Sequence, residues 1–208
     1  MLMARSFFIT GTDTGVGKTY VACQLIRHYV AQGYQVVGMK PVAAGSVLVG
    51  GEWINEDVAL LSAASNVKAP KALVNPYCFK APIAPHIAAH DEQVKIDFEL
   101  ILSAYNQLTL LADVVIVEGA GGLLVPLSEH STIADLISYM DIPTVLVVGM
   151  KLGCLNHALL SKEVAISRKL PLKMWVANTM NPPMLAYEEN LRTLERLFQE
   201  LERLQFNN

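Results

Sequence analysis

Short apolar runs alternate with longer amphipathic stretches along almost the whole chain. Val- and Ile-rich runs are typical of buried strands, whereas apolar residues at every third or fourth position predict helices. The expected strands cover residues 6–10, 35–39, 113–117, 143–148 and 173–177, with a weaker strand near 72–79. The expected helices cover residues 19–31, 57–64, 98–111, 133–140, 156–169 and 187–204.

This regular alternation favours an α/β fold, in which a parallel β-sheet is flanked by helices on both faces and the crossovers are right-handed. The 208 residues contain no internal repeat, low-complexity tract or linker, so we expect one domain over residues 1–208. Ligands of such sheets bind beyond the carboxyl ends of the strands. Candidate site residues are therefore sought directly after each expected strand.

Composition and charge exclude several other classes of protein. Hydrophobic residues make up 52% of the chain, but Gly, Glu or Pro interrupts every apolar run before the ~18 residues of a membrane span. Residues 1–5 contain no secretory signal, and the three cysteines have no metal-type spacing, so we expect a cytoplasmic protein with reduced thiols. A net charge of −3 without a basic stripe gives no support for nucleic-acid binding.

The most specific motif is the segment GTDTGVGKT, which runs from Gly11 to Thr19 between the first strand and the first helix. Backbone N–H groups of such a loop surround nucleotide phosphates, and the helix N-terminus adds partial positive charge. Lys18 would reach the β- and γ-phosphates, and the Thr19 hydroxyl would hold Mg²⁺. Five residues separate Gly11 from Gly-Lys-Thr where the common pattern has four, so this is a variant P-loop.

Three more candidates follow other strands or open a helix. Lys40 precedes a proline and a glycine turn, and it is either a ligand-facing cation or a surface lysine. Asp57 opens a helix, either as an ordinary cap or as a carboxylate facing Mg²⁺. Glu118 ends a buried strand before the glycine-rich residues 119–122, where a carboxylate needs a cationic partner. Mg²⁺ on the P-loop is the natural partner for Glu118, although a plain turn is the alternative.

Two later positions have weaker signals. Residues 153–156 begin a helix whose free N–H groups suit a carboxylate, although a simple helix start explains them equally well. Asn178 follows the fifth strand, where its amide offers the donors and acceptor that purine recognition needs or merely forms a turn.

Together these segments closely resemble the dethiobiotin synthetase family. The resemblance runs in order from residue 7 to residue 183, and its motifs are residues 11–19, 40–45, 57, 75–77, 84–86, 118–122, 151–157 and 175–178. It implies a P-loop NTPase-type fold and an ATP-dependent ligase of biotin biosynthesis, with Mg²⁺ as cofactor. The implied substrates are 7,8-diaminononanoate, CO₂ and ATP. An amine would capture CO₂ as a carbamate, the γ-phosphate would convert it to a mixed anhydride, and the second amine would close the ring.

The same resemblance implies a role for each matching residue. The implied catalytic residues are Lys40, Lys18 and Thr14, and the implied metal ligands are Thr19, Asp57 and Glu118. The implied nucleotide-binding residues are Gly15, Val16, Gly17, Lys18, Thr19, Tyr20, Asp57, Glu118, Gly119, Ala120, Gly121, Asn178 and Thr179. The implied substrate-binding residues are Thr14, Lys40, Ala44, Gly153, Cys154, Leu155 and Asn156, the last four across the interface of a homodimer.

The chain departs from the family pattern at three places. Gly15 stands where some members have Glu, and Ala44 stands where others have Ser. The sequence ends at Asn208, whereas members often continue into a Pro-containing segment that closes over the base. We therefore expect weak selectivity for the nucleotide base.

Two other P-loop classes are alternatives. ATPase switches of the partitioning type share Gly-Val-Gly-Lys-Thr, but they have a signature lysine at the place of Asp13. Glutamine-dependent amidoligases of corrinoid synthesis use a related ATP domain but need a glutaminase domain, for which 208 residues leave no room.

Overall fold

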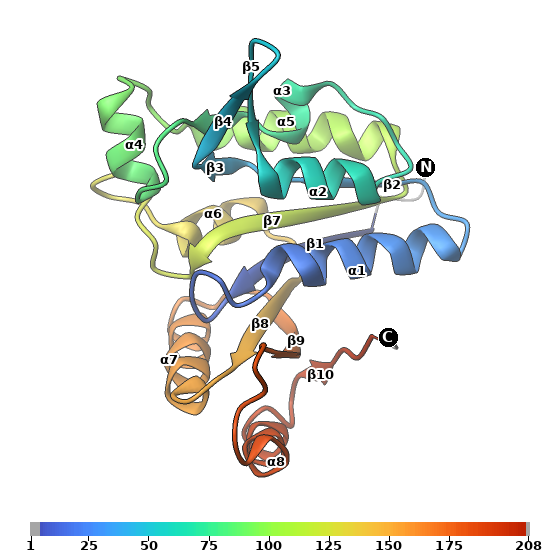
Figure 1. The fold of residues 1–208 in the computed structure, drawn as a ribbon, viewed down its shortest axis with the longest axis vertical. Helices are drawn as coiled ribbons and strands as arrows, with labels where there is room; N and C mark the ends of the chain where they lie inside the picture. The colour runs from blue at the N-terminus through green and yellow to red at the C-terminus, as the bar shows by residue number, and fades with distance from the viewer. Residues whose placement is uncertain (1–4, 207–208) are drawn as a thin grey trace.

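A six-stranded parallel sheet forms the centre of the computed structural model, which describes residues 5–206 (Figure 1). The strand order is β10-β9-β8-β1-β7-β2. The strands are β1 (Arg5–Gly11), β2 (Val36–Met39), β7 (Val114–Gly122), β8 (Thr144–Met150), β9 (Leu172–Thr179) and β10 (Glu202–Arg203). The expectation that residues 1–5 contain no secretory signal falls mostly on residues 1–4, which lie outside the described part.

Helices cover both faces of this sheet, as predicted. One face carries α1 (Lys18–Ala31) and α2 (Glu56–Ala64), and the other carries α5 (Phe98–Leu111), α6 (Ile133–Met140), α7 (Cys154–Ser167) and α8 (Tyr187–Leu197). Along β8, Val145 and Val147 pack in the cluster that includes α1, whereas Leu146 and Val148 pack with α7 and α8. Because both faces are covered, the strand residues are apolar without alternation.

Smaller elements lie beside the carboxyl end of β2. The strand β3 (Val42–Ala44) pairs in parallel with β6 (Tyr77–Phe79), and β4 (Ser46–Val49) pairs with β5 (Glu52–Asn55) in a hairpin that projects at the top of Figure 1. The short helices α3 (Lys71–Val74) and α4 (Pro85–Asp91) flank β6 in sequence. The predicted weak strand near 72–79 was therefore wrong over its first half, which is helical.

The predicted last helix was too long. Helix α8 ends at Leu197, because Phe198 packs edge-on against the buried ring of Trp175 and the chain then turns back. The following residues form the edge strand β10, in which Glu202 pairs with Met174 of β9. A nonlocal pairing of this kind leaves no trace in the helical pattern of residues 187–204.

Strand β7 is longer than its apolar run. It was expected to end at Val117, yet it continues through Gly122, which pairs with Gly11 beyond an irregularity in the β1 register. Glycine has low strand propensity, so the sequence pattern ended too early. Glu118 consequently lies in the middle of the strand rather than at its end.

The carboxyl ends of neighbouring strands bring the candidate residues to one edge. The P-loop follows β1, Lys40 follows β2, Glu118 lies in β7, Lys151 follows β8 and Asn178 lies in β9. These five strands are consecutive neighbours in the sheet. Within residues 5–206, none of the helices has the length and apolar character that crossing a bilayer requires.

Candidate nucleotide site

Val16 fixes the P-loop to the sheet. Its side chain is fully buried in the space left by two glycines, since a methyl group on Gly11 would lie 2.7 Å from Val16 Cγ2 and one on Gly149 would lie 2.9 Å from Cγ1. Gly15 and Gly17 have positive φ values of 72° and 89°, which suit glycine. The loop is therefore positioned by packing between β1 and β8.

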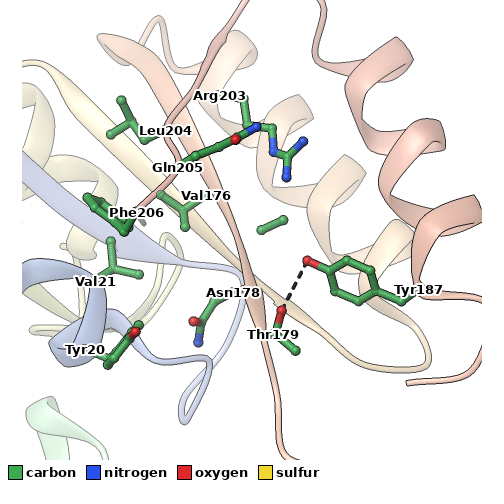
Figure 2. Close-up of a pocket in the computed structure, with 11 residues that line it drawn as sticks. Tyr20, Val21, Val176, Asn178, Thr179, Tyr187, Arg203, Leu204, Gln205 and Phe206 are labelled. Carbon is green, nitrogen blue, oxygen red and sulfur yellow. Dashed lines mark hydrogen bonds between the residues drawn. The ribbon is translucent and has the colours of Figure 1, made fainter. Parts of the chain in front are cut away.

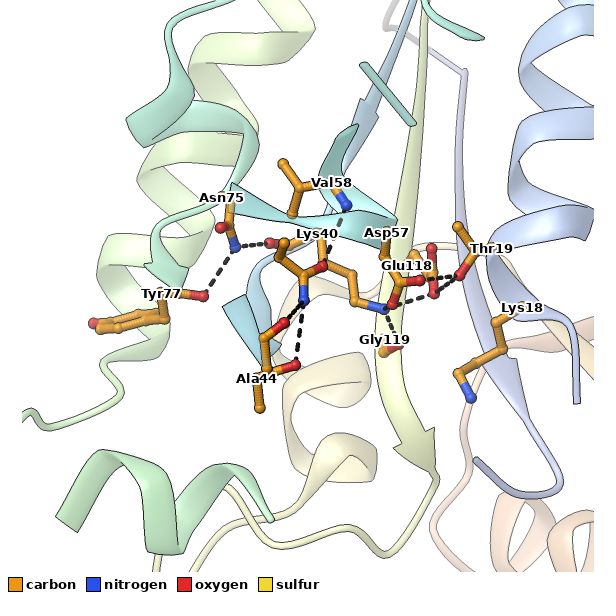
Figure 3. A network of polar contacts seen from close by, with 12 residues as sticks. Lys18, Thr19, Lys40, Ala44, Asp57, Val58, Asn75, Tyr77, Glu118 and Gly119 are labelled. Atoms are coloured by element: carbon orange, nitrogen blue, oxygen red, sulfur yellow. Dashed lines mark hydrogen bonds and ion pairs between the residues drawn. The ribbon is translucent and has the colours of Figure 1, made fainter. Parts of the chain in front are cut away.

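Lys18 is buried at the start of α1, with its ammonium directed back along the loop (Figure 3). Its Nζ donates a hydrogen bond to the Asp13 carbonyl oxygen at 2.9 Å. Burial, followed by the charge of Lys40, lowers the pKa of Lys18 to about 8. An anion bound at the loop would favour the charged form of this lysine.

Lys40 is buried at the centre of a polar network (Figure 3). Its Nζ lies 2.8 Å from Asp57 Oδ2 and 2.6 Å from Glu118 Oε1. The Thr19 hydroxyl lies 2.8 Å from Asp57 Oδ1 and 2.9 Å from Glu118 Oε1. The structure thus brings together four predicted site residues from α1, the end of β2, α2 and β7.

The opposite charges in this network stabilise one another, but burial and the charge of Asp57 still raise the pKa of Glu118 above its ordinary value. Burial alone would lower the pKa of Lys40, but the carboxylates of Glu118 and Asp57 outweigh it and raise that pKa above its ordinary value. Burial likewise opposes ionisation of Asp57, yet the Lys40 charge and the Thr19 hydrogen bond lower the Asp57 pKa. Lys40 is accordingly an ammonium in the folded protein.

Asp57 is not the cap of its helix. Asn55 occupies the N-cap position, where its Oδ1 accepts a hydrogen bond from the Val58 N–H at 3.3 Å. The Asn55 Nδ2 donates to the carbonyl oxygens of Ala44 and Gly45 at 3.2 and 3.0 Å. Because Asn55 provides the cap, the Asp57 carboxylate is directed to Thr19 and Lys40 instead.

Asn75 has a structural role that the sequence did not reveal. Its buried Nδ2 donates to the Lys40 carbonyl oxygen at 2.7 Å and to the Tyr77 carbonyl oxygen at 2.9 Å. These bonds join the backbone of Lys40 to the segment that precedes β6. The residue lies 35 positions away in sequence, so no local pattern could have identified the contact.

The residues that were predicted as metal ligands fit a magnesium ion. Thr19, Asp57 and Glu118 supply hydroxyl and carboxylate oxygens, which are the donors that Mg²⁺ prefers. Glu118 Oε2 is buried and accepts no hydrogen bond from the residues that the structure describes. A buried carboxylate oxygen without a partner is costly, and a bound cation would satisfy it.

A cavity of about 390 Å³ lies on the β9 side of the P-loop, and Figure 2 shows its lining. Asn178 Nδ2 donates to the Val16 carbonyl oxygen at 2.9 Å, and the Thr179 hydroxyl contacts the Tyr187 hydroxyl at 3.2 Å. Residues 203–206 form part of the wall, together with Tyr20. The predicted role of Asn178 in reading adenine stays a prediction, because its amide is bonded to the loop in this structure.

A second cavity of about 470 Å³ lies on the other side of the P-loop. Its wall includes Thr14 and His157 beside the apolar side chains of Leu123, Val125 and Val164. The neighbouring Gly121 has a positive φ of 60°, and a methyl group on it would lie 3.5 Å from Thr14 Oγ1. This cavity combines an apolar surface with the predicted reaction centre.

The remaining predicted residues occupy two places. Gly119 and Ala120 continue β7 beyond Glu118, and the Gly119 carbonyl oxygen lies 3.4 Å from Lys40 Nζ. Gly153 caps α7 with a positive φ of 93°, and Cys154, Leu155 and Asn156 form its first turn. The helix start at these residues was predicted correctly.

Sequence comparison identifies named relatives. Residues 5–204 match a family model described as an AAA domain. The ATP-dependent dethiobiotin synthetase BioD of Aromatoleum aromaticum is 50% identical over 94% of this chain and 87% of that protein. The enzyme of the same name from Nitrosospira multiformis is 49% identical over 94% of this chain and 85% of that protein.

Solved structures with a similar fold have low sequence identity to this chain. A ParA family ATPase from Chlorobium tepidum has a TM-score of 0.55 at 15% identity, with 99% of this chain and 85% of that chain covered. The cell division protein MinD from Aquifex aeolicus has a TM-score of 0.56 at 13% identity, covering 98% and 83%. These likenesses show the P-loop NTPase-like fold, whereas the half-identical relatives show the family. The chain belongs to the dethiobiotin synthetase family.

Proposed function

We propose that this protein converts 7,8-diaminononanoate, CO₂ and ATP to dethiobiotin, ADP and phosphate. One amine of the substrate captures CO₂ as a carbamate. A carbamate oxygen attacks the γ-phosphorus, and ADP leaves, which gives a carbamic–phosphoric mixed anhydride. The second amine then attacks the carbonyl carbon, releases phosphate and closes the ureido ring.

The observation that carries this proposal is the network of the buried Lys40 and Glu118 with the half-buried Thr19 and Asp57 at the P-loop. Carbamate phosphorylation brings two anions together, and their repulsion opposes the reaction. Lys18 and Lys40 supply two ammonium groups at the place where the anions would meet. A module that merely bound nucleotide would have no need of the second lysine.

Magnesium fits the same site. Thr19, Asp57 and Glu118 would hold the ion, which when bound neutralises charge on the phosphate oxygens. Thr14 lines the second cavity, and the proposal gives its hydroxyl the role of orienting the reacting groups. The apolar wall of that cavity suits the hydrocarbon chain of the diamine.

The decisive experiment measures ADP release with and without diaminononanoate and bicarbonate, with dethiobiotin identified by mass spectrometry. We expect ADP release to require both co-substrates. Equal turnover of ATP without the diamine would contradict the synthetase function and favour a switch of the partitioning type. Lys40→Ala is the matched variant: it should abolish product formation and leave MgADP affinity largely intact, since Lys18 and the loop N–H groups remain.

The substrate carboxylate is proposed to bind at residues 153–156 of a partner subunit in a homodimer. Intersubunit complementation tests this arrangement. Lys40→Ala and Asn156→Asp should each be inactive, the second because it places a negative charge beside the substrate carboxylate. An equal mixture of the two variants should regain about a quarter of the parent activity, because about half of the dimers are heterodimers and each of these contains one intact site of two. Absence of recovery in a verified heterodimer would place both groups in one chain.

A further inference from the structure

Asp13, an acidic residue of the P-loop, contacts three parts of the site at once. Its Oδ2 lies 3.1 Å from Lys151 Nζ, and its Oδ1 accepts a hydrogen bond from the Thr14 N–H at 2.7 Å. Its backbone carbonyl oxygen accepts the hydrogen bond from Lys18 Nζ at 2.9 Å. The position of Asp13 therefore determines how both Lys18 and Thr14 are presented.

A carboxylate at this place has an electrostatic cost. The P-loop is expected to receive a polyphosphate, and an unpaired negative charge beside it would repel that ligand. Lys151 removes this difficulty, because its ammonium lies against the carboxylate and the pair is neutral. The Lys151 hydrogen bond and then the Thr14 N–H keep the pKa of Asp13 below its usual value, so neutrality comes from pairing rather than from protonation.

Lys151 belongs to the turn that joins β8 to α7. Its backbone N–H donates to the Gly149 carbonyl oxygen at 2.9 Å, and its carbonyl oxygen accepts from the Cys154 N–H at 2.9 Å. Gly149 contacts Val16 closely, and Cys154 begins α7. The ion pair thus links the P-loop to the turn whose backbone is already fixed at both ends.

We propose that Lys151 is a positioning residue that acts through Asp13. It cancels the charge of the Asp13 carboxylate beside the phosphates, whereas the contacts of Asp13 with Lys18 Nζ and the Thr14 N–H do not depend on that charge. The inference rests on the proposed function, because it takes the P-loop to hold the phosphates of ATP. It adds to that function a residue that does not touch the nucleotide.

Calorimetric MgADP binding to the full chain tests this role without any need for the diamine. Lys151→Met should weaken MgADP binding on the order of tenfold, the effect expected of one uncompensated charge near a polyphosphate. Asp13→Asn keeps an acceptor for the Thr14 N–H but removes the charge, so its affinity should stay within about twofold of the parent. Adding Asp13→Asn to Lys151→Met should restore most of the lost affinity, and Lys151→Arg should retain it.

Lys173→Met is the control for loss of one positive charge, since Lys173 is exposed near the amino end of β9, away from the site. It should bind MgADP like the parent. An unchanged affinity in Lys151→Met would overturn the inference. If Lys151→Met lowered MgADP affinity equally in the parent and in Asp13→Asn, the inference would also be overturned, because Lys151 would then act on the phosphates directly. Failure of the parent protein itself to bind MgADP would instead contradict the proposed function.

Discussion

Replacing Lys40 by methionine should destabilise the protein strongly when magnesium is absent. The change keeps the length of the side chain but removes the ammonium that lies 2.6 Å from Glu118 and 2.8 Å from Asp57. The Glu118 side chain is 1% exposed and that of Asp57 is 38% exposed, so one carboxylate loses its partner in the interior and the other is partly hydrated. Removing one partner of a buried pair costs about 3–5 kcal/mol, and the exposure of Asp57 favours about 3 kcal/mol.

Urea unfolding followed by tryptophan fluorescence measures this loss, because unfolding exposes the buried Trp175 to water. With an m value of about 2 kcal/mol per M, the midpoint in EDTA should fall by about 1.5 M. Magnesium should stabilise Lys40→Met more than the parent, since the ion would supply the missing positive charge without displacing a lysine. Lys71→Met is the matched control, because Lys71 pairs with Glu52 at 3.5 Å on the surface and should change stability by less than about 1 kcal/mol.

Two outcomes would refute this reasoning. Similar midpoints for Lys40→Met and Lys71→Met in EDTA would mean that the buried pair does not contribute as its geometry indicates. Equal stabilisation of the parent and Lys40→Met by magnesium would mean that the ion does not bind at Thr19, Asp57 and Glu118.

Three further predictions concern the same site. MgADP affinity should fall as pH rises through about 8, the pKa of Lys18 in the ligand-free protein, because the phosphates favour the charged ammonium form. Calorimetry in buffers of different ionisation enthalpy should therefore detect proton uptake on binding near pH 8, and little uptake well below that pH. Gly149→Ala should cost about 1–3 kcal/mol in urea and weaken MgADP binding, because the methyl group would lie 2.9 Å from Val16; unchanged binding would contradict the packing argument. Asn75→Ala should cost about 1–3 kcal/mol and reduce kcat while MgADP affinity is kept, and a loss of affinity equal to the loss of rate would place Asn75 in ground-state binding.

Much of the fold and the site could be predicted because the relevant signals are local. Buried parallel strands are continuous apolar runs, and the residues that follow them share one edge of the sheet. Lys40 and Glu118 were identified in this way, and the structure places their charged atoms 2.6 Å apart. The roles of these residues remain predictions, since they depend on ligands.

What the sequence did not predict depends on contacts between distant residues. The Asp13–Lys151 pair joins residues that are 138 positions apart in the sequence. The Asn75 side chain donates its hydrogen bond to the backbone carbonyl oxygen of Lys40. Strand β10 exists because it pairs with β9, and the end of β7 is a strand despite its glycines. Each of these features comes from tertiary pairing that overrides local propensity.

The packing of the Val16 side chain between β1 and β8 has a consequence for mutations far from the nucleotide site. A flexible glycine loop would lose about 1–2 kcal/mol of conformational freedom per residue on closing around an anion. Here the side chain of Val16, packed where Gly11 and Gly149 leave room, orders the loop during folding. Phosphate affinity is then coupled to the integrity of the hydrophobic core. Substitutions that weaken the packing of β1 against β8 should therefore lower nucleotide affinity in a binding assay, although the substituted side chains do not contact the nucleotide.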